Sequence, residues 1–284
     1  ITVDNNILES VQNGTTGTLD ATPNWWGSAA GPAEGAVYGA VTYAPWCKTE
    51  ACDELAPDEN GVIDLTPPEG EEEPLTPEEI QTAINNAPSG STIVIPADTY
   101  TQVGAFEIST PNLTIKLSDG TVIQNNSPCF VVNASYTQII AEPGAKCIPT
   151  GNSNGIDVAA GLVNIVIDGL EIDGTTQDPD ENIFPDGIHF AGVVTDVLLV
   201  DNKIHDMDGD GVEFFAQPTG MIDIHGNLFQ NNGGVGINNA NGTSAIDATY
   251  NSWGSYGGPT GEGGDGVSAN VDYDPYTYGD FWMS

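Results

Sequence analysis

Short apolar runs recur along the second half of the chain at intervals of roughly 20–32 residues. Each run is rich in Ile, Val and Leu and is bounded by Gly, Asn or Asp, which predicts a β-strand. The runs are LTIKL at 113–117, QIIAE at 138–142, NIVIDGLEI at 164–172, DVLLVDNKI at 196–204, MIDIHGNLF at 221–229 and AIDATYNSW at 245–253. Their spacing predicts one strand position per turn of a repeating coil.

A second strand position follows the middle runs, and each of its members opens on a glycine. The members lie at 155–158, 187–190, 211–214 and 236–239. Two strand positions with Gly- and Asn-rich bends, repeated at a regular interval, predict a chain that coils and stacks on itself. In such a solenoid the apolar side chains form one inner stack, and the backbone of each coil pairs with the next.

A helix is predicted just before the first coil. Thr76 is its N-cap, Pro77 takes the first helical position, and Glu79 completes a capping box. The segment EEIQTAINNAP then places four apolar side chains on one face, namely Ile80, Ala83, Ile84 and Ala87. The pattern predicts a short amphipathic helix.

The end of the chain occurs twice. Residues 1–46 match residues 222–276, with short insertions between the matched positions. The matched pairs include Asn6 with Asn227, Asp20 with Asp247, Trp26 with Trp253, Pro32 with Pro259 and Tyr43 with Tyr273. The repeat predicts that 1–47 is the closing segment of a preceding module and that 76–284 is a whole module. Residues 48–75, rich in Pro and Glu, are predicted to be an extended acidic linker.

The segment EEIQTAINNAPSGSTIVIPADTYT at 78–101 resembles the entrance of right-handed parallel β-helix proteins of the pectate-lyase-like family. The D-N-x-I…G-I coils are similar to the generic repeat of that family. The N-x-W-G…G-P…Y-x-P ending is similar to the closing segment of bacterial and archaeal surface β-helix proteins. The resemblance implies an all-β, right-handed parallel β-helix solenoid with a short N-terminal capping helix. It implies no single function, because the fold carries lyases, hydrolases, epimerases, adhesins and structural proteins.

Charge narrows the choice of partners. The chain has 41 Asp and Glu against four Lys and no Arg, for a net charge of −37. Nucleic acid is excluded because nothing would neutralise its phosphates, and an anionic membrane surface is disfavoured for the same reason. No stretch is long and apolar enough to insert into a membrane. Such a chain repels its own copies and is expected to depend on cations, as salt or as bound Ca²⁺ or Mg²⁺. Adaptation to high salt is the plainer alternative.

Four cysteines suggest two disulfides, Cys47 with Cys52 across a short loop and Cys129 with Cys147 about one coil apart. An even number of cysteines without CxxC spacing fits an extracellular, cell-surface protein. The first residue is an Ile inside a strand-like run. This start fits a leader removed during secretion or a segment cut from a longer protein.

The second strand position carries a column of polar outward side chains, Asp157, His189, Glu213 and Asn238, with Asp186, Asp206, Asp208 and Asp210 in the adjoining bends. A pair such as Asp186 and Asp210 could act as acid and base in glycoside hydrolysis, helped by His189 or His205. The chain lacks the Asp-Asp, Gly-His-Gly and Arg-x-Lys signatures of hydrolases with this fold, and it lacks the Arg of lyases. We therefore assign no catalytic residue and favour a solvated structural face.

Alternating carboxylates mark one candidate metal site. Asp206, Asp208 and Asp210 precede Gly211, like the first half of a calcium loop. Gln217 stands where a bidentate Glu is expected, so Glu213 or an acid of a neighbouring coil would complete the ligands. The candidate Ca²⁺ ligands are Asp206, Asp208, Asp210 and Glu213, and an exposed acidic turn is the alternative.

The tryptophans lie in or after the two closing segments, at Trp25, Trp26, Trp46, Trp253 and Trp282. This placement favours covering the last coil, or an assembly contact, over a platform for stacking sugars. Sequons that permit N-glycosylation without indicating it occur at Asn13, Asn112, Asn125, Asn133 and Asn241.

Together these features favour a non-catalytic structural component of an extracellular assembly, such as a surface layer, sheath or filament of β-helix modules joined head to tail. The expected partner is the protein itself, because a head-to-tail contact does not close on itself and produces a fibre. The second hypothesis is an extracellular polysaccharide-binding protein or adhesin. The third is a calcium-dependent polysaccharide lyase or a glycoside hydrolase.

Overall fold

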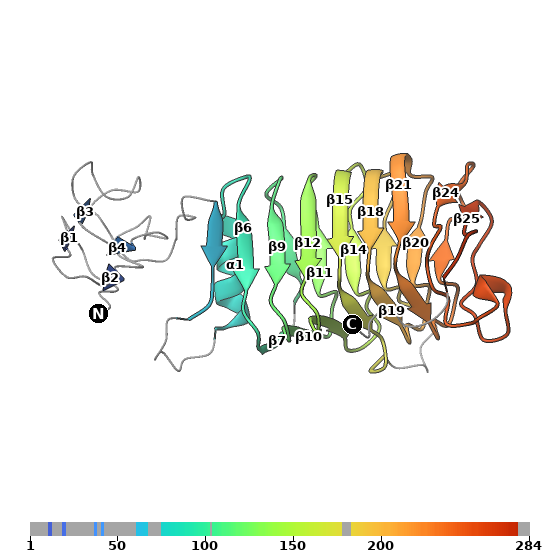
Figure 1. Cartoon of the computed structure of the whole chain (residues 1–284), viewed down its shortest axis with the longest axis horizontal. Helices are drawn as coiled ribbons and strands as arrows, with labels where there is room; N and C mark the ends of the chain where they lie inside the picture. The colour runs from blue at the N-terminus through green and yellow to red at the C-terminus, as the bar shows by residue number, and fades with distance from the viewer. Residues whose placement is uncertain are drawn as a thin grey trace.

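The computed structural model describes residues 61–67, 75–102, 104–177 and 183–277, together with the backbone of four two-residue strands within residues 1–60. Residues 61–277 form a parallel β-solenoid, elongated along the stacking direction of its coils (Figure 1). One α-helix occurs among the described residues, so the predicted all-β class is confirmed.

Each full coil passes through three parallel sheets, numbered here in the order of passage. Sheet 1 contains β5 (Val62–Asp64), β6 (Thr92–Ile95), β9 (Thr114–Leu117), β12 (Thr137–Ala141), β15 (Val163–Asp168), β18 (Thr195–Val200), β21 (Thr219–His225), β24 (Ile246–Asp247) and β25 (Val271–Asp272). Sheet 2 contains β7 (Thr99–Gln102), β10 (Val122–Asn125), β13 (Lys146–Pro149), β16 (Glu171–Asp173), β19 (Lys203–His205) and β22 (Leu228–Gln230). Sheet 3 contains β8 (Phe106–Ile108), β11 (Phe130–Val132), β14 (Ile156–Val158), β17 (Ile188–Phe190), β20 (Val212–Phe214) and β23 (Ile237–Asn238).

The core is a stack of apolar side chains that alternate with outward residues along each strand. In sheet 1 the inward positions of successive strands are in register as Ile93, Ile115, Ile139, Ile167, Leu199 and Ile224. In sheet 3 the rings of Phe190 and Phe214 stack with their centroids 4.6 Å apart. These side chains are almost fully buried, and removal of this apolar surface from water is the main stabilising contribution to the solenoid.

Sheet 2 was not predicted, because its strands continue the apolar runs of sheet 1. In the run at 164–172, β15 ends at Asp168 and β16 begins at Glu171, with Gly169 between them in the left-handed region at φ 74°. Asp201 (φ 53°) and Gly226 (φ 69°) adopt the same conformation at the equivalent bends. Gly and Asp tolerate positive φ, so each long run folds as two strands across a sharp bend.

Buried asparagines connect these bends from coil to coil. The backbone N–H of Asn202 donates to Asn227 Oδ1 at 2.9 Å, and that of Asn227 donates to Asn251 Oδ1 at 2.9 Å. Each side-chain amide also donates to a carbonyl oxygen of the preceding coil, such as Leu199 O for Asn227. The ladder pairs backbone groups that a buried bend would otherwise leave without a partner.

The helix α1 (Pro77–Asn86) packs on β6, β7 and β8 at the beginning of the solenoid. The predicted capping box is confirmed: Thr76 Oγ1 accepts from the N–H of Glu79 at 3.3 Å, and Glu79 Oε2 accepts from the N–H of Thr76 at 2.8 Å. Ile80 and Ile84 are buried on the predicted apolar face. α1 thereby covers the open end of the core.

Part of the predicted linker belongs to the solenoid. β5 pairs in parallel with β6, and Ile63 is only 1% exposed. The prediction of an extended linker throughout 48–75 is therefore wrong for 61–65. The Val-Ile pair is too short to stand out within a Pro- and Glu-rich segment, and it becomes a strand because the edge of sheet 1 offers it a partner.

A closing turn ends the described chain. It contains β24, β25 and the 3₁₀ helix Gly258–Thr260, and it covers Trp253, which is completely buried. The Trp253 ring stacks on Phe229 with centroids 5.1 Å apart. Within residues 1–60 the strands pair in the same parallel sense: β1 (Val11–Gln12) with β3 (Val37–Tyr38), and β2 (Leu19–Asp20) with β4 (Val41–Thr42).

The predicted disulfide between Cys129 and Cys147 is confirmed, with the Cα atoms 5.9 Å apart. Cys147 lies in β13 and Cys129 immediately precedes β11, so the bond joins two consecutive coils. Cys47 and Cys52 lie outside the described residues. No helix in the described part of the chain is long and apolar enough to cross a membrane.

Candidate functional site

The predicted polar column is present on the outer face of sheet 3. Asp157 of β14 pairs in register with His189 of β17, which pairs with Glu213 of β20, which pairs with Asn238 of β23. The residues on either side of each outward position are buried, as in the Ile188–Phe190 strand. The alternation of inward and outward side chains therefore brings these four polar groups, from four coils, into one row.

A ladder of side-chain oxygens borders the column where each strand begins. Asn154 Oδ1 accepts from the backbone N–H of Asp186, Asp186 Oδ1 from that of Asp210, and Asp210 Oδ1 from that of Val235. Each of these distances is 2.7 Å. One oxygen of Asp186 and one of Asp210 therefore hold neighbouring coils together, and only their second oxygens face the column.

His189 lies between two carboxylates. Its Nδ1 atom is 3.0 Å from Glu213 Oε2 and 3.4 Å from Asp186 Oδ2. The hydrogen bond to Asp186, opposed by burial and supported by the charge of Glu213, raises the pKa of His189. Burial and the nearby carboxylate of Asp186 raise the pKa of Glu213. Both the imidazole of His189 and the carboxyl group of Glu213 therefore hold a proton more tightly than they would in water.

Two shallow hollows lie along the column. One of about 380 Å³ is lined by Asp157, Asp186, His189 and Glu213, with the exposed side chains of Ile183 and Phe184 at its wall. The other, of about 230 Å³, is lined by Asp186, Asp208, Asp210 and Glu213. Burial raises the pKa of Asp210, whose Oδ2 atom accepts from Asn238 Nδ2 at 2.7 Å.

Three of the four predicted calcium ligands contact different neighbours, whereas Asp208 lines the smaller hollow and its buried Oδ2 atom has no hydrogen-bond partner among the described residues. Asp206 Oδ2 lies 2.6 Å from His205 Nδ1, whereas Asp210 bonds Val235 and Asn238, and Glu213 contacts His189. Among the described residues, three metal-ligating atoms lie within 4.8 Å of one another in Asp186–His189–Glu213 and in Glu171–Asp173–His205. Of the four predicted calcium ligands, only Glu213 is a member of one of these two groups. The predicted set of Ca²⁺ ligands stays a prediction, although the coil geometry directs Asp206 and Asp210 toward different neighbours.

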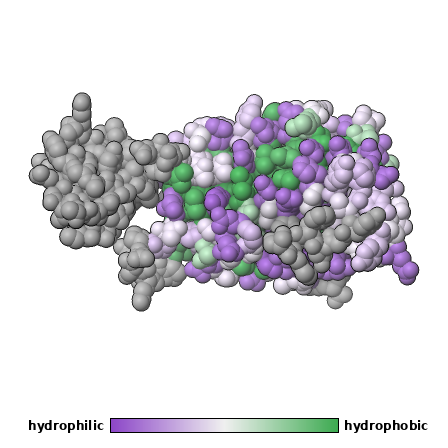
Figure 2. All heavy atoms as spheres, in the orientation of Figure 1, coloured by the Kyte–Doolittle hydropathy of each residue, from purple (hydrophilic) through white to green (hydrophobic). Residues whose placement is uncertain are grey.

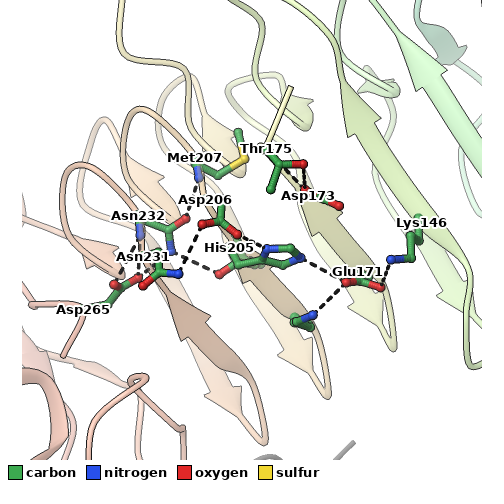
Figure 3. A network of polar contacts seen from close by, with 12 residues as sticks. Lys146, Glu171, Asp173, Thr175, His205, Asp206, Met207, Asn231, Asn232 and Asp265 are labelled. Carbon is green, nitrogen blue, oxygen red and sulfur yellow. Dashed lines mark hydrogen bonds and ion pairs between the residues drawn. The ribbon is translucent and has the colours of Figure 1, made fainter. Parts of the chain in front are cut away.

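A second polar network lies on sheet 2 (Figure 3). Glu171 Oε1 accepts from Lys203 Nζ at 2.8 Å, and Glu171 Oε2 accepts from Lys146 Nζ at 2.9 Å. His205 Nε2 lies 3.0 Å from Glu171 Oε1, and its Nδ1 contacts Asp206. The hydrogen bond from His205, then those from the two lysines, hold the pKa of Glu171 well below its usual range against its burial.

The charge of this network opposes a metal ion at Glu171. Burial lowers the pKa of His205, but its hydrogen bonds to Glu171 and Asp206 outweigh this effect and leave the pKa raised. Lys146 and Lys203 already neutralise Glu171, and His205 is its third partner. The network is a set of ion pairs between coils, and its ligating atoms are occupied.

The network on sheet 2 was missed by sequence reasoning. Lys146, Glu171 and Lys203 occupy the same outward position in three consecutive strands, since Lys146 pairs with Glu171 and Glu171 with Lys203. The sequence does contain a signal, because charged residues recur here at intervals of one coil. Recognising it requires the positions of the bends, which set the length of each coil. Asp265, which binds the buried Asn232, left no signal in the local sequence.

The other predicted residues have clear positions where they are described. Trp253 is inside the core and cannot stack on a sugar. Asn125 is buried and its amide donates to the carbonyl oxygens of Gly104 and Pro128, so a glycan does not fit there. Asn112, Asn133 and Asn241 are exposed. Outside the described residues lie Asn13, Trp25, Trp26, Trp46 and Trp282.

Comparison with known proteins adds no family assignment: no protein-family model, curated protein or solved structure matches the chain.

Proposed function

We propose that this protein is a non-catalytic structural component of an extracellular assembly, a surface layer, sheath or filament made from β-helix modules joined in series. The observation that carries the proposal is the repetition of the closing turn. Residues 1–46 repeat the sequence of residues 222–276, and their four short strands repeat its pairing. A chain that contains two module endings is built for serial arrangement.

The correspondence extends to individual strands. Val11 pairs with Val37 as Ile237 pairs with Val267, and Leu19 pairs with Val41 as Ile246 pairs with Val271. The matched sequence also keeps apolar residues where the closing turn buries Ile224, Phe229 and Trp253, with Val3, Leu8 and Trp26 at these places. This agreement supports residues 1–47 as the end of a second module.

The coils support a finer classification. The three-sheet coil, the asparagine ladder and the capping helix agree with the right-handed parallel β-helix of the pectate-lyase-like family that the sequence resembles. A right-handed crossover between parallel strands is also the physically favoured hand. The disulfide between Cys129 and Cys147 supports folding in an oxidising compartment, as expected at a cell surface.

The geometry of the column supports a non-catalytic role. Asp186 and Asp210 each use one oxygen to hold the backbone of the next coil. The Nδ1 atom of His189 is within 3.4 Å of both Asp186 and Glu213. Contacts of this kind stabilise the stack and support a structural role.

Cation dependence is part of the proposal, with Ca²⁺ as the first candidate. It rests on the net charge of −37, because copies with this charge repel one another unless cations lie between them. Asp206, Asp210 and Glu213 each contact a different neighbouring side chain or backbone group. We therefore place the effect in many surface carboxylates, and assign no step to a single bound ion.

Electron microscopy of the purified protein tests the proposal. Samples at matched ionic strength with millimolar Ca²⁺ and with EDTA are compared. Regular fibres or sheets are expected with Ca²⁺, with loosened assemblies in EDTA that molar NaCl restores only partly. Equal rescue by NaCl would assign the effect to screening. Single elongated particles under every condition would contradict an assembly role.

A polysaccharide-binding role is the second candidate, favoured by the position of Phe184. This side chain is 69% exposed beside the hollow that contains Asp157 and His189. An aromatic ring next to polar groups is a common arrangement for sugar contacts. Binding on a glycan array that is lost in Phe184→Ala would establish this role, whereas an array without any signal would remove it.

A further inference from the structure

One group of side chains in the polar column combines a ring nitrogen with two carboxylates. His189 of β17 lies beside Glu213 of β20, its register partner, and beside Asp186 in the bend before β17. One ligating atom from each of the three residues lies within 4.8 Å of the other two. Hydrophilic residues are scattered over the solenoid face drawn in Figure 2, so carboxylates by themselves mark no site on this chain. The nitrogen atom and the short mutual distances distinguish this group.

The distances fit a small divalent ion. Zn²⁺ binds nitrogen and oxygen at about 2.0–2.2 Å in a tetrahedral arrangement, which separates neighbouring ligand atoms by roughly 3.3–3.6 Å. His189 Nδ1 lies 3.4 Å from Asp186 Oδ2 and 3.0 Å from Glu213 Oε2. An ion can therefore replace the proton in these two contacts after a small movement of the Glu213 side chain.

The carboxylate of Asp186 is already oriented toward such an ion. Asp186 Oδ1 accepts from the backbone N–H of Asp210 at 2.7 Å, and the backbone N–H of Asp186 donates to Asn154 Oδ1 at 2.7 Å. These bonds to the two adjacent coils leave Asp186 Oδ2 facing His189. Hydrogen bonds behind a metal ligand fix its orientation and strengthen metal binding.

Asp208 provides an independent indication of a cation. It lines a hollow of about 230 Å³ together with Asp186 and Glu213. Its Oδ2 atom is buried and has no hydrogen-bond partner among the described residues. A buried carboxylate oxygen is costly unless a donor or a cation lies nearby. A hydrated ion held by Asp186 and Glu213 would supply the missing donor through a bound water.

The charge of the group also favours a cation. The network around Glu171 on sheet 2 likewise combines a histidine with carboxylates, but two lysines neutralise it (Figure 3). Within the part of the chain that the structure describes, lysines pair only with Glu142 and Glu171. None of them pairs with Asp186 or Glu213. A divalent ion would compensate these two carboxylates, as lysine does on sheet 2.

We propose that Asp186, His189 and Glu213 bind one borderline divalent cation, with Zn²⁺ as the first candidate. Imidazole nitrogen favours Zn²⁺ over Ca²⁺, which prefers oxygen ligands. Three protein ligands leave the fourth position to water, on the side of the hollow of about 380 Å³. The ion joins the coils of β17 and β20. The site goes beyond the proposed function, because one solenoid is sufficient to form it.

Equilibrium dialysis of the full, tag-free chain against micromolar Zn²⁺ tests the site. Millimolar Ca²⁺ is present throughout, so that the harder ion occupies ordinary surface carboxylates. The wild type should retain about one Zn²⁺ per chain, and His189→Gln or Glu213→Gln should each weaken binding at least about tenfold. His205→Gln, the same change in the network neutralised by lysine, is the matched control and should bind like the wild type. Circular dichroism checks that each variant is folded.

X-ray absorption of the Zn²⁺-loaded wild type tests the ligands without any variant. The expected spectrum contains one imidazole nitrogen and oxygen ligands at about 2.0–2.2 Å. Zn²⁺ should also raise the urea midpoint of the wild type but not that of His189→Gln, because the ion binds only the folded stack. Absence of Zn²⁺ binding in the presence of Ca²⁺, unchanged binding in His189→Gln, loss of binding in His205→Gln alone, or a spectrum without imidazole would each overturn the inference.

Discussion

Single buried polar residues hold the coils of this protein in register. Asp265 illustrates the cost, because its carboxylate is 6% exposed and accepts from the side-chain amide of Asn232 at 2.6 Å. Asn232 in turn accepts from the backbone N–H of Met207 at 3.1 Å (Figure 3). The carboxyl group of Asp265 therefore holds two further coils in place through Asn232. The cost is that its charged form is removed from water.

Asp265 should make stability depend on pH. Burial, opposed by its hydrogen bonds to Asn232, raises the pKa of Asp265 from 3.8 to about 6. The folded protein therefore binds this proton more tightly than the unfolded chain, and the stabilisation is complete below pH 3.8 and is lost as the pH rises through about 6. Asp265→Asn, which keeps an acceptor for Asn232, should lose this dependence.

Urea unfolding of both proteins at several pH values measures the effect. The free energy of unfolding of the variant, relative to the wild type, should increase by up to about 3 kcal/mol between pH 3.5 and pH 7.5. His205→Gln serves as a comparison, since the raised pKa of His205 also gives stability that is lost on raising the pH, but through a different network. A constant difference between wild type and Asp265→Asn would contradict the assignment.

Individual strands in this solenoid are too short to be stable alone. β14 and β17 contain three residues each, and they persist because each is paired on both sides by strands of adjacent coils. The disulfide between Cys129 and Cys147 adds a covalent link between two such coils. It joins the second and third of the six coils that pass through all three sheets, where separation of coils would expose the core in both directions.

Removal of this link should lower stability without changing the fold. The bond closes a loop with a sequence separation of 18 residues. Restricting the unfolded chain over that length contributes about 3 kcal/mol, so Cys129→Ala with Cys147→Ala should lower the free energy of unfolding by this amount. Addition of reductant should destabilise the solenoid of the wild type similarly and leave that of the double variant unchanged, because the predicted Cys47–Cys52 pair lies outside residues 61–277. Equal stability of the two proteins in oxidising buffer would contradict this expectation.

At the largest scale, the described solenoid is a stack with two protected ends. α1 covers the first coil and the closing turn covers the last, with Ile84 buried at one end and Trp253 at the other. End-to-end pairing of strands between copies is therefore not available in the described solenoid without displacing a cap. Serial connection through the chain is an arrangement consistent with these caps.

Damage to a cap should produce self-association as well as instability. Ile84→Asp places a charge against the first coil and should lower the free energy of unfolding by at least about 3 kcal/mol. The uncovered strand edges of β7 and β8 should then pair with other copies, which light scattering would detect during partial unfolding. Thr82→Asp, an exposed position of the same helix, is the control and should behave like the wild type.

Local sequence was sufficient for features that depend on one coil. The alternation in Ile188-His189-Phe190 identifies an outward histidine between two buried residues, and the capping box at Thr76 and Glu79 identifies a helix start. The recurring interval also identified the disulfide partners Cys129 and Cys147. Sheet 2 was not predicted because the bend at Gly169 or Asp201 lies inside an apolar run, and the residues before and after the bend are similar in composition.

The sequence by itself determined that this chain forms a stacked coil with an apolar interior and the polar column on one outer face. Only the tertiary structure decided which side chains meet across coils. The Lys146–Glu171–Lys203 ion pairs and the contact of His189 with Glu213 both depend on that register. The reason is physical: side-chain alternation is a property of one strand, whereas register between coils is set by bends of variable length.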